Sequence, residues 1–212
     1  RRGQRDERGR RFLMAHIPSQ VRDKIRDGAR RSMTVITDLI IDQFAPSSVI
    51  DVGCGEGFLT SEMRSRGVAA FGVDGDELPG VDRVVDLTDP PDLGQFDVAV
   101  SLEVGEHLPP AAAGRFVQLL CDSAPIVVFS AAIPSQGGPG HVNEQWPAYW
   151  AALFAEHGHV HSSGALRWQV WDDTDVECWY RQNLLVFAST PLALPADGCP
   201  AVVHPDIWSI YR

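Results

Sequence analysis

The sequence predicts an α/β fold in which a mostly parallel sheet is flanked by helices. Short apolar runs alternate with stretches of helical periodicity through most of the chain, and this alternation is typical of βαβ units with a parallel sheet. Two further strand-like segments lie close together near the C-terminus. They indicate an antiparallel edge hairpin at one side of the sheet.

Each element follows from a local residue pattern. Helices are expected where apolar residues recur at helical spacing, bounded by residues such as Pro46, Gly67 and Gly158 that do not continue a helix. Strands are expected in short apolar runs between turn residues. The predicted helices are Pro18–Phe44, Phe58–Arg66, Pro109–Leu120 and Glu144–His157, and the predicted strands are Ser48–Val52, Ala69–Val73, Val81–Val85, Phe96–Ser101, Pro125–Ala131, Ala165–Trp171 and Gln182–Ala188.

The length of 212 residues suits one domain. We divide the chain into a basic N-terminal tail at residues 1–17 and a single domain at 18–212, which opens with a helical cap at about residues 18–45. No apolar run is long enough to cross a bilayer, and the N-terminus lacks the apolar region of a secretory signal. We therefore expect a soluble, cytoplasmic protein without a membrane span, present as a monomer or homodimer.

The formal net charge of −10 makes nucleic acid an unlikely partner, because proteins that bind it usually neutralise phosphates with a basic face. Arginines cluster within the first eleven residues. We interpret them as a solvated tail, with a phosphate-contacting arm as the alternative. The four cysteines form no CxxC or zinc-type pair, so they indicate neither a metal knuckle nor a redox motif.

The segment Val49–Thr60 carries the first signal of a ligand site. An apolar strand runs directly into the glycine-rich turn Gly53–Gly57 and then into a helix. Glycines let a ligand approach the backbone closely, and the helix start offers free N–H groups. The spacing is GxGxG rather than the GxGxxG of dinucleotide sites. Asp51, just before the turn, would repel a pyrophosphate but can approach an ammonium group.

Acidic residues follow the next two predicted strands. Asp74 is expected to accept hydrogen bonds from both ribose hydroxyls of an adenosine, although Asp74-Gly75-Asp76 is also good turn chemistry. Asp86 could accept from an adenine amino group while Leu87 packs on the ring. The alternative for Asp86 is an ordinary loop aspartate.

Three segments together resemble the class I S-adenosylmethionine-dependent methyltransferases. They are Val49–Thr60, Phe71–Asp76 and Phe96–Pro109, which reads FDVAVSLEVGEHLP. The resemblance covers about residues 35–190. It implies a Rossmann-like seven-stranded sheet of order 3-2-1-4-5-7-6, with S-adenosylmethionine as methyl donor and S-adenosylhomocysteine as product. The predicted cofactor-binding residues are Asp51, Gly53, Cys54, Gly55, Phe58, Asp74, Gly75, Asp86, Leu87, Leu102 and Glu103.

One departure from related families narrows the acceptor. After the fourth predicted strand the chain reads Ser101-Leu102-Glu103-Val104, where amino-methyltransferases acting on DNA carry an Asp/Asn-Pro-Pro-Tyr/Phe signature and cytosine C5 enzymes carry a Pro-Cys pair. We therefore expect an O-methyltransferase acting on a small polar molecule, a sugar or a natural-product intermediate. The alternatives are an RNA or protein methyltransferase, or a non-catalytic protein that binds the cofactor.

Two histidines are candidate bases for a hydroxyl acceptor, because methyl transfer needs an aligned nucleophile that loses its proton. His107 follows the fourth strand, and a structural role in its loop is the alternative. His141 lies in a glycine-rich loop after the fifth strand, a candidate lid, with Glu144 as a further catalytic candidate. The predicted substrate-binding residues are Asn143, Gln145, Trp146 and Trp168.

The same loop has a plainer interpretation as the entry to a helix. In that case Asn143 is an N-cap residue, and Trp146 and Trp150, one helical turn apart, pack into the core. A bound metal ion is a further alternative, since some sugar O-methyltransferases use one. His141 and Glu144 are too small a ligand set to predict it, so no metal ligand is expected.

Overall fold

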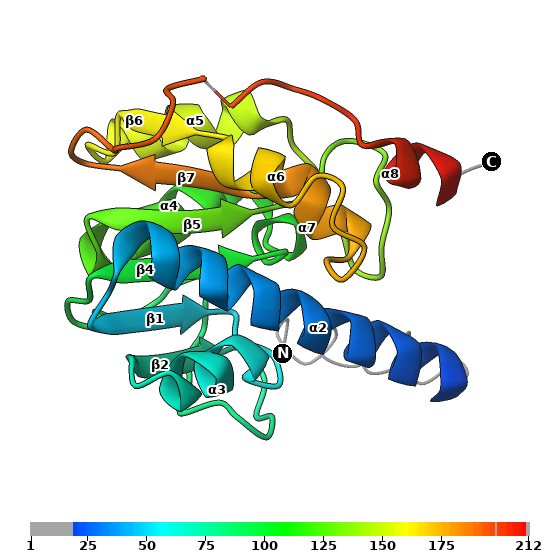
Figure 1. The fold of residues 1–212 in the computed structure, drawn as a ribbon. Helices are drawn as coiled ribbons and strands as arrows, with labels where there is room; N and C mark the ends of the chain where they lie inside the picture. Colours follow the sequence, from blue (N-terminus) through cyan, green and yellow to red (C-terminus); the bar gives the residue numbers. More distant parts are fainter. Residues whose placement is uncertain (1–18, 198, 211–212) are drawn as a thin grey trace.

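The computed structural model describes residues 19–197 and 199–210, so the basic tail predicted for residues 1–17 lies outside the described residues. Seven strands form one sheet in the order β3-β2-β1-β4-β5-β7-β6 (Figure 1). The strands are β1 Ser48–Val52, β2 Ala69–Asp74, β3 Arg83–Val84, β4 Val98–Leu102, β5 Ile126–Ser130, β6 His161–Ser163 and β7 Leu185–Ala188. The α/β class and the strand order implied by the family resemblance are confirmed.

Helices precede, separate and follow the strands along the chain. Two short 3-10 turns, η1 and η2, follow β4. No helix of the described residues is long and apolar enough to span a bilayer. The helices are α2 Ser19–Phe44, α3 Phe58–Ser65, η1 Gly105–His107, η2 Pro110–Ala112, α4 Ala113–Ser123, α5 Pro147–Glu156, α6 Ala165–Gln169, α7 Cys178–Asn183 and α8 Pro205–Ile210.

The strand pairing decides where a ligand can bind. β1 pairs in parallel with β2 and β4, and β4 pairs in parallel with β5. Their carboxyl ends therefore meet at one edge of the sheet, the edge at which open α/β sheets bind ligands. β7 runs antiparallel to both β5 and β6, which confirms an antiparallel pair near the C-terminus.

Two hydrophobic layers cover the sheet, one on each face. Neighbouring residues of a strand point to opposite faces, and here both sets are apolar, as in a doubly covered sheet. In β4, Val98 and Val100 face α2 and α3, while Ala99 faces α4 and α5. This two-sided burial is why the central strands read as continuous apolar runs in the sequence.

The C-terminal elements differ from the prediction. The strand predicted at Ala165–Trp171 is wrong, because this segment begins with helix α6. Leu166 and Val170, one helical turn apart, are both buried and pack on the sheet. The edge strand comes earlier, as β6, and only the second half of the predicted Gln182–Ala188 strand is β7. Helices α6 and α7 therefore separate the two antiparallel strands.

The predicted starts of two helices also differ from those in the structure. The helix expected from Glu144 begins at Pro147, where proline is favoured because its missing N–H would be unpaired in any case. The helix expected from Pro109 starts as the 3-10 turn η2 and becomes α-helical at Ala113. Glu144 lies in the loop before α5, where its side chain contacts His141.

Candidate functional site

The glycine turn after β1 requires glycine for steric reasons. Gly53, Gly55 and Gly57 all have positive φ values, of 84°, 54° and 71°, a region that favours glycine. A Cβ on Gly57 would lie 2.7 Å from the carbonyl oxygen of Gly80. The N–H groups of Gly53 and Cys54 both donate to the Val73 carbonyl, at 2.8 and 3.0 Å, so the turn is fixed to the end of β2.

Asp74 at the end of β2 holds the same turn. Its Oδ2 accepts from the N–H of Gly55 at 2.8 Å, and its Oδ1 accepts from the N–H of Asp76 at 3.0 Å. Each carboxylate oxygen can accept a second hydrogen bond. The turn geometry that the sequence suggested is therefore present, and it leaves acceptor capacity for ligand hydroxyls.

A cavity of about 470 Å³ lies between the glycine turn and α2. Figure 1 shows the first half of α2 projecting beyond the carboxyl ends of the strands. Arg26 of α2 pairs with Glu56 of the turn at 2.6 Å, and the guanidinium of Arg30 lies 4.8 Å from the ring centre of Phe58. The helical cap therefore forms one wall of the cavity.

Six of the predicted cofactor residues line this cavity and five do not. The lining includes Asp51, Gly53, Cys54, Gly55, Phe58 and Leu102. Asp74, Gly75, Asp86, Leu87 and Glu103 lie outside the lining. The α2 residues Arg26 and Met33, and Tyr180 from α7, also line the cavity. Sequence reasoning missed these three because no local motif marks them.

Asp51 gives the cavity its electrostatic character. Its side chain is only 5% exposed, and burial, followed by the charge of Asp74, raises its pKa to about 7. No arginine or lysine of the described residues forms an ion pair with it. Burying a carboxylate without a cation is costly, so this position suits a ligand with a positive group. Burial and the same two carboxylates also raise the pKa of the Cys54 thiol.

The residues after β3 are occupied by local contacts. The Oδ1 of Asp86 accepts from the N–H and the hydroxyl of Thr88, at 2.8 and 2.6 Å, and these bonds lower the pKa of Asp86. Leu87 is buried in the hydrophobic layer of α4 and α5. The roles of Asp86 and Leu87 toward adenine stay predictions.

Glu103 lies directly after β4 in a network of amides. Its φ value is 56°, and its carboxylate accepts from Asn183 at 3.0 Å and from Gln136 at 3.1 Å. Burial raises the pKa of Glu103. Glu106 is fully buried, and burial, then the charge of Glu103, raises its pKa well above the usual range. Burial and these charges also raise the pKa of Tyr180.

The loop after β5 brings the two candidate histidines together. The rings of His107 and His141 meet edge to face with centres 4.9 Å apart. Nδ1 of His141 lies 2.9 Å from Oε1 of Glu144. That carboxylate also accepts from the N–H groups of Ser135 and Gly137, at 2.8 and 2.6 Å. Glu144 thus closes the loop and orients His141.

The predicted substrate-binding residues lie in two places. The loop before α5 holds Asn143, Gln145 and Trp146, and helix α6 holds Trp168. Asn143 is 2% exposed, and its Oδ1 accepts from Gln145 at 3.0 Å. The N-cap role for Asn143 is wrong, because Trp146 precedes the first turn of α5. Trp146 is 41% exposed, so only its neighbour Trp150 joins the core. Trp168 of α6 donates to Asp197 at 3.0 Å and does not line the cavity.

Comparison with known proteins identifies the family. The family model of a methyltransferase domain matches residues 21–177, most of the chain. The magnesium-protoporphyrin O-methyltransferase of Rhodobacter capsulatus is 33% identical over 100 residues, which are 40% of this chain and 44% of that protein. The ubiquinone biosynthesis O-methyltransferase of Pseudomonas paraeruginosa is 36% identical over 84 residues, 32% of this chain and 36% of that protein. The chain spans less than half the length of these curated relatives.

Solved structures share the fold at low sequence identity. DesVI of Streptomyces venezuelae superposes with a TM-score of 0.62 at 15% identity, covering 81% of this chain and 98% of that one. Magnesium protoporphyrin IX methyltransferase of Synechocystis, solved with bound S-adenosylhomocysteine, gives 0.60 at 17% identity, covering 80% and 87%. Together with the glycine turn and the acidic residues around it, the family match shows that the chain belongs to the class I S-adenosylmethionine-dependent methyltransferases.

Proposed function

We propose that this methyltransferase transfers the methyl group of S-adenosylmethionine to a hydroxyl oxygen of a small polar acceptor, a sugar or a natural-product intermediate. One observation carries the proposal. His107 and His141 meet beyond the carboxyl ends of β4 and β5, the edge where Leu102 and the glycine turn line the cavity. The curated relatives are named O-methyltransferases, and the acidic charge of the chain disfavours a polyanionic acceptor.

The methyl donor is assigned to the cavity beneath α2. Asp51 faces its ammonium group, because that buried carboxylate has no arginine or lysine partner among the described residues. The glycine turn lies against its backbone-like portion, where a Cβ would intrude. Asp74 accepts from the ribose hydroxyls with the acceptor capacity that the turn leaves unused. Asp86 and Leu87 are assigned to the adenine.

The acceptor is assigned to the loop after β5. Its hydroxyl oxygen attacks the methyl carbon in line, the bond from carbon to sulfur breaks, and S-adenosylhomocysteine leaves. The hydroxyl proton must be lost in the same event, and His141 and His107 are assigned to assist. Asn143, Gln145 and Trp146, from the same loop, flank the acceptor.

The test is a panel of small hydroxyl compounds incubated with S-adenosylmethionine, with S-adenosylhomocysteine and the mass of the methylated product as readouts. We expect one or more acceptors to gain a methyl group on oxygen. The His141→Gln variant should then lose most turnover while retaining cofactor affinity, and His157→Gln, at the end of α5, should not. Methylation only of nitrogen, of RNA or of protein, or a full rate in His141→Gln, would contradict the proposal.

A further inference from the structure

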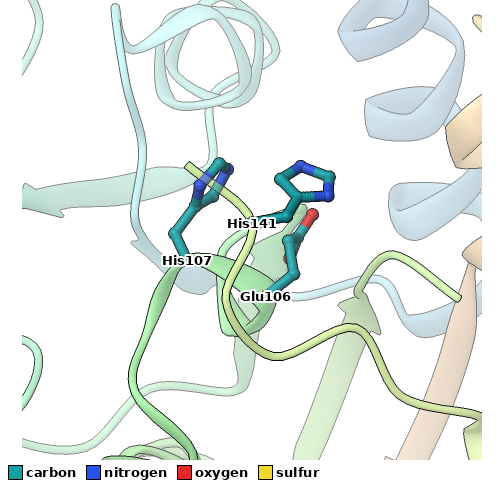
Figure 2. Close-up of side chains that lie close together, drawn as sticks. All are labelled: Glu106, His107 and His141. Atoms are coloured by element: carbon teal, nitrogen blue, oxygen red, sulfur yellow. The ribbon is translucent and has the colours of Figure 1, made fainter. Parts of the chain in front are cut away.

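Three side chains of the described residues converge beyond the carboxyl ends of β4 and β5. Glu106, His107 and His141 each offer one ligand atom, and these atoms all lie within 4.8 Å of one another. Figure 2 shows them approaching from two segments, with the Glu106 carboxylate directed toward His141. We call them the Glu–His–His cluster. The first two belong to η1 after β4, and the third belongs to the loop after β5, so adjacent parallel strands bring them together.

The carboxylate of Glu106 is buried without a lysine or arginine partner among the described residues. Its side chain is fully buried, and neither carboxylate oxygen makes a hydrogen bond of ordinary geometry, although the Glu103 side chain and the N–H of Ala132 lie close to it. The partly buried carboxylate of Glu103 adds repulsion of the same sign. Among the described residues, no lysine or arginine forms an ion pair with either group. A buried unpaired carboxylate is strongly disfavoured, so a cation bound between Glu106 and the two histidines would stabilise its ionised form.

His141 is oriented as metal-binding histidines are. Its Nδ1 lies 2.9 Å from Oε1 of Glu144, and that carboxylate is itself held by two backbone N–H groups of the loop. A carboxylate that accepts the proton of one ring nitrogen leaves the other nitrogen as a lone-pair donor. The contact therefore prepares His141 to bind a cation through Nε2.

We propose that Glu106, His107 and His141 bind one divalent cation of the first transition row, such as Zn²⁺ or Mn²⁺. Two imidazoles and a carboxylate suit these ions better than Mg²⁺ or Ca²⁺, which prefer oxygen. Bond lengths of about 2.0–2.2 Å place ligand atoms roughly 3–4 Å apart, so small side-chain rotations bring the cluster into range. Three protein ligands leave a coordination position open for another molecule.

The bound cation would activate the acceptor hydroxyl for methyl transfer. This role of the cation rests on the proposed function. The acceptor oxygen binds the open position, which lowers the pKa of its hydroxyl. The proton passes to water, the bond from oxygen to methyl carbon forms, the bond from carbon to sulfur breaks, and S-adenosylhomocysteine leaves. His141 is then a ligand rather than the general base expected from the sequence, and the expectation of no metal ligand is revised.

The test measures cation binding directly. The full chain is prepared without a polyhistidine tag, stripped with a chelator, and titrated with Zn²⁺ and separately with Mn²⁺ by calorimetry. We expect one equivalent to bind. His107→Ala and His141→Ala should each weaken binding at least 10-fold, and Glu144→Gln, which removes the orienting charge, should weaken it by about 10- to 100-fold.

Matched controls separate the site from adventitious binding. His157→Ala and Glu156→Gln change a histidine and a carboxylate at the end of α5, remote from the cluster in sequence, and should leave the affinity unchanged. Glu106→Gln keeps the side-chain shape while removing the buried charge, so it should fold and yet bind at least 10-fold more weakly. Absence of binding to the wild-type chain, or an affinity equal to that of the wild-type chain in Glu106→Gln and in the histidine variants, would overturn the proposal.

Cofactor binding and methyl transfer are measured separately from cation binding. Binding of S-adenosylhomocysteine should survive in every cluster variant, since none of the three residues lines the cavity. If the cation binds the cluster but the methylated product carries its new group on nitrogen, the acceptor class is wrong and the metal site stands. If hydroxyl acceptors are methylated at an undiminished rate by the stripped enzyme and no cation binds, the metal site is wrong and the acceptor class stands.

Discussion

Replacing Asp51 by asparagine should stabilise the ligand-free protein and weaken its hold on the methyl donor. Asp51 is buried beside Asp74, and its pKa is raised from 3.8 to about 7. A carboxyl group whose pKa is higher in the folded state favours folding when protonated. The wild-type chain therefore loses stability as pH rises above 3.8, and the whole penalty is present above pH 7.

The size of the effect follows from that pKa. One pKa unit corresponds to about 1.4 kcal/mol, so between pH 5 and pH 8 the Asp51 penalty grows by at most about 3 kcal/mol. Asparagine carries no charge and escapes this penalty. For a chain of this size about 3 kcal/mol corresponds to a shift in Tm of roughly 6–12 °C. The Tm advantage of Asp51→Asn over wild type should therefore be larger at pH 8 than at pH 5.

The assay is thermal unfolding at both pH values, with and without S-adenosylhomocysteine, joined to calorimetric titration of that ligand. The variant should bind it about 10- to 100-fold more weakly, because it lacks the proposed desolvated ion pair between Asp51 and the ammonium group. Asp42→Asn, an exposed carboxylate on α2, is the control and should change neither quantity. A Tm advantage that is equal at both pH values, or an unchanged affinity, would refute the electrostatic role given to Asp51.

Three further predictions concern the turn and the loop. Asp74→Ala removes the bond to Gly55 and the proposed bonds to the ribose, so calorimetry should show S-adenosylhomocysteine binding weakened by about 10- to 100-fold, whereas Asp76→Ala should bind as wild type does. Gly57→Ala should lower the free energy of unfolding by at least about 1–2 kcal/mol, measured by denaturant titration, because its φ is positive and its Cβ would meet a backbone oxygen. Glu144→Gln should reduce kcat at least about 10-fold by releasing the loop, with cofactor affinity kept; an unchanged kcat would argue against it.

The central sheet was predictable because its signals are local. Ser48–Val52 is predicted with the bounds the structure shows, since a doubly covered strand is a continuous apolar run. The glycine turn was equally plain, because the positive φ at Gly53 and Gly57 leaves few alternatives to glycine. Leu166 and Val170 misled the prediction, because a helix barely longer than one turn offers too short a periodic pattern to be told from a strand.

The walls of the site were predictable only in part, because they are made by contacts across the chain. Tyr180 reaches the cavity from α7, and Arg26 reaches it from α2. Glu106 lies in the segment SLEVGEH, but its partnership with His141 depends on the pairing of β4 with β5. No spacing within one segment reveals such a pair.

The other site assignments depend on the cavity between α2 and the glycine turn being the donor site. Calorimetric titration of the purified chain with S-adenosylhomocysteine tests this. We predict one site per chain, with affinity lowered in Asp51→Asn and in Met33→Trp, which fills the cavity from α2. No heat of binding in the wild-type chain, or wild-type affinity in both variants, would contradict this assignment of the donor site.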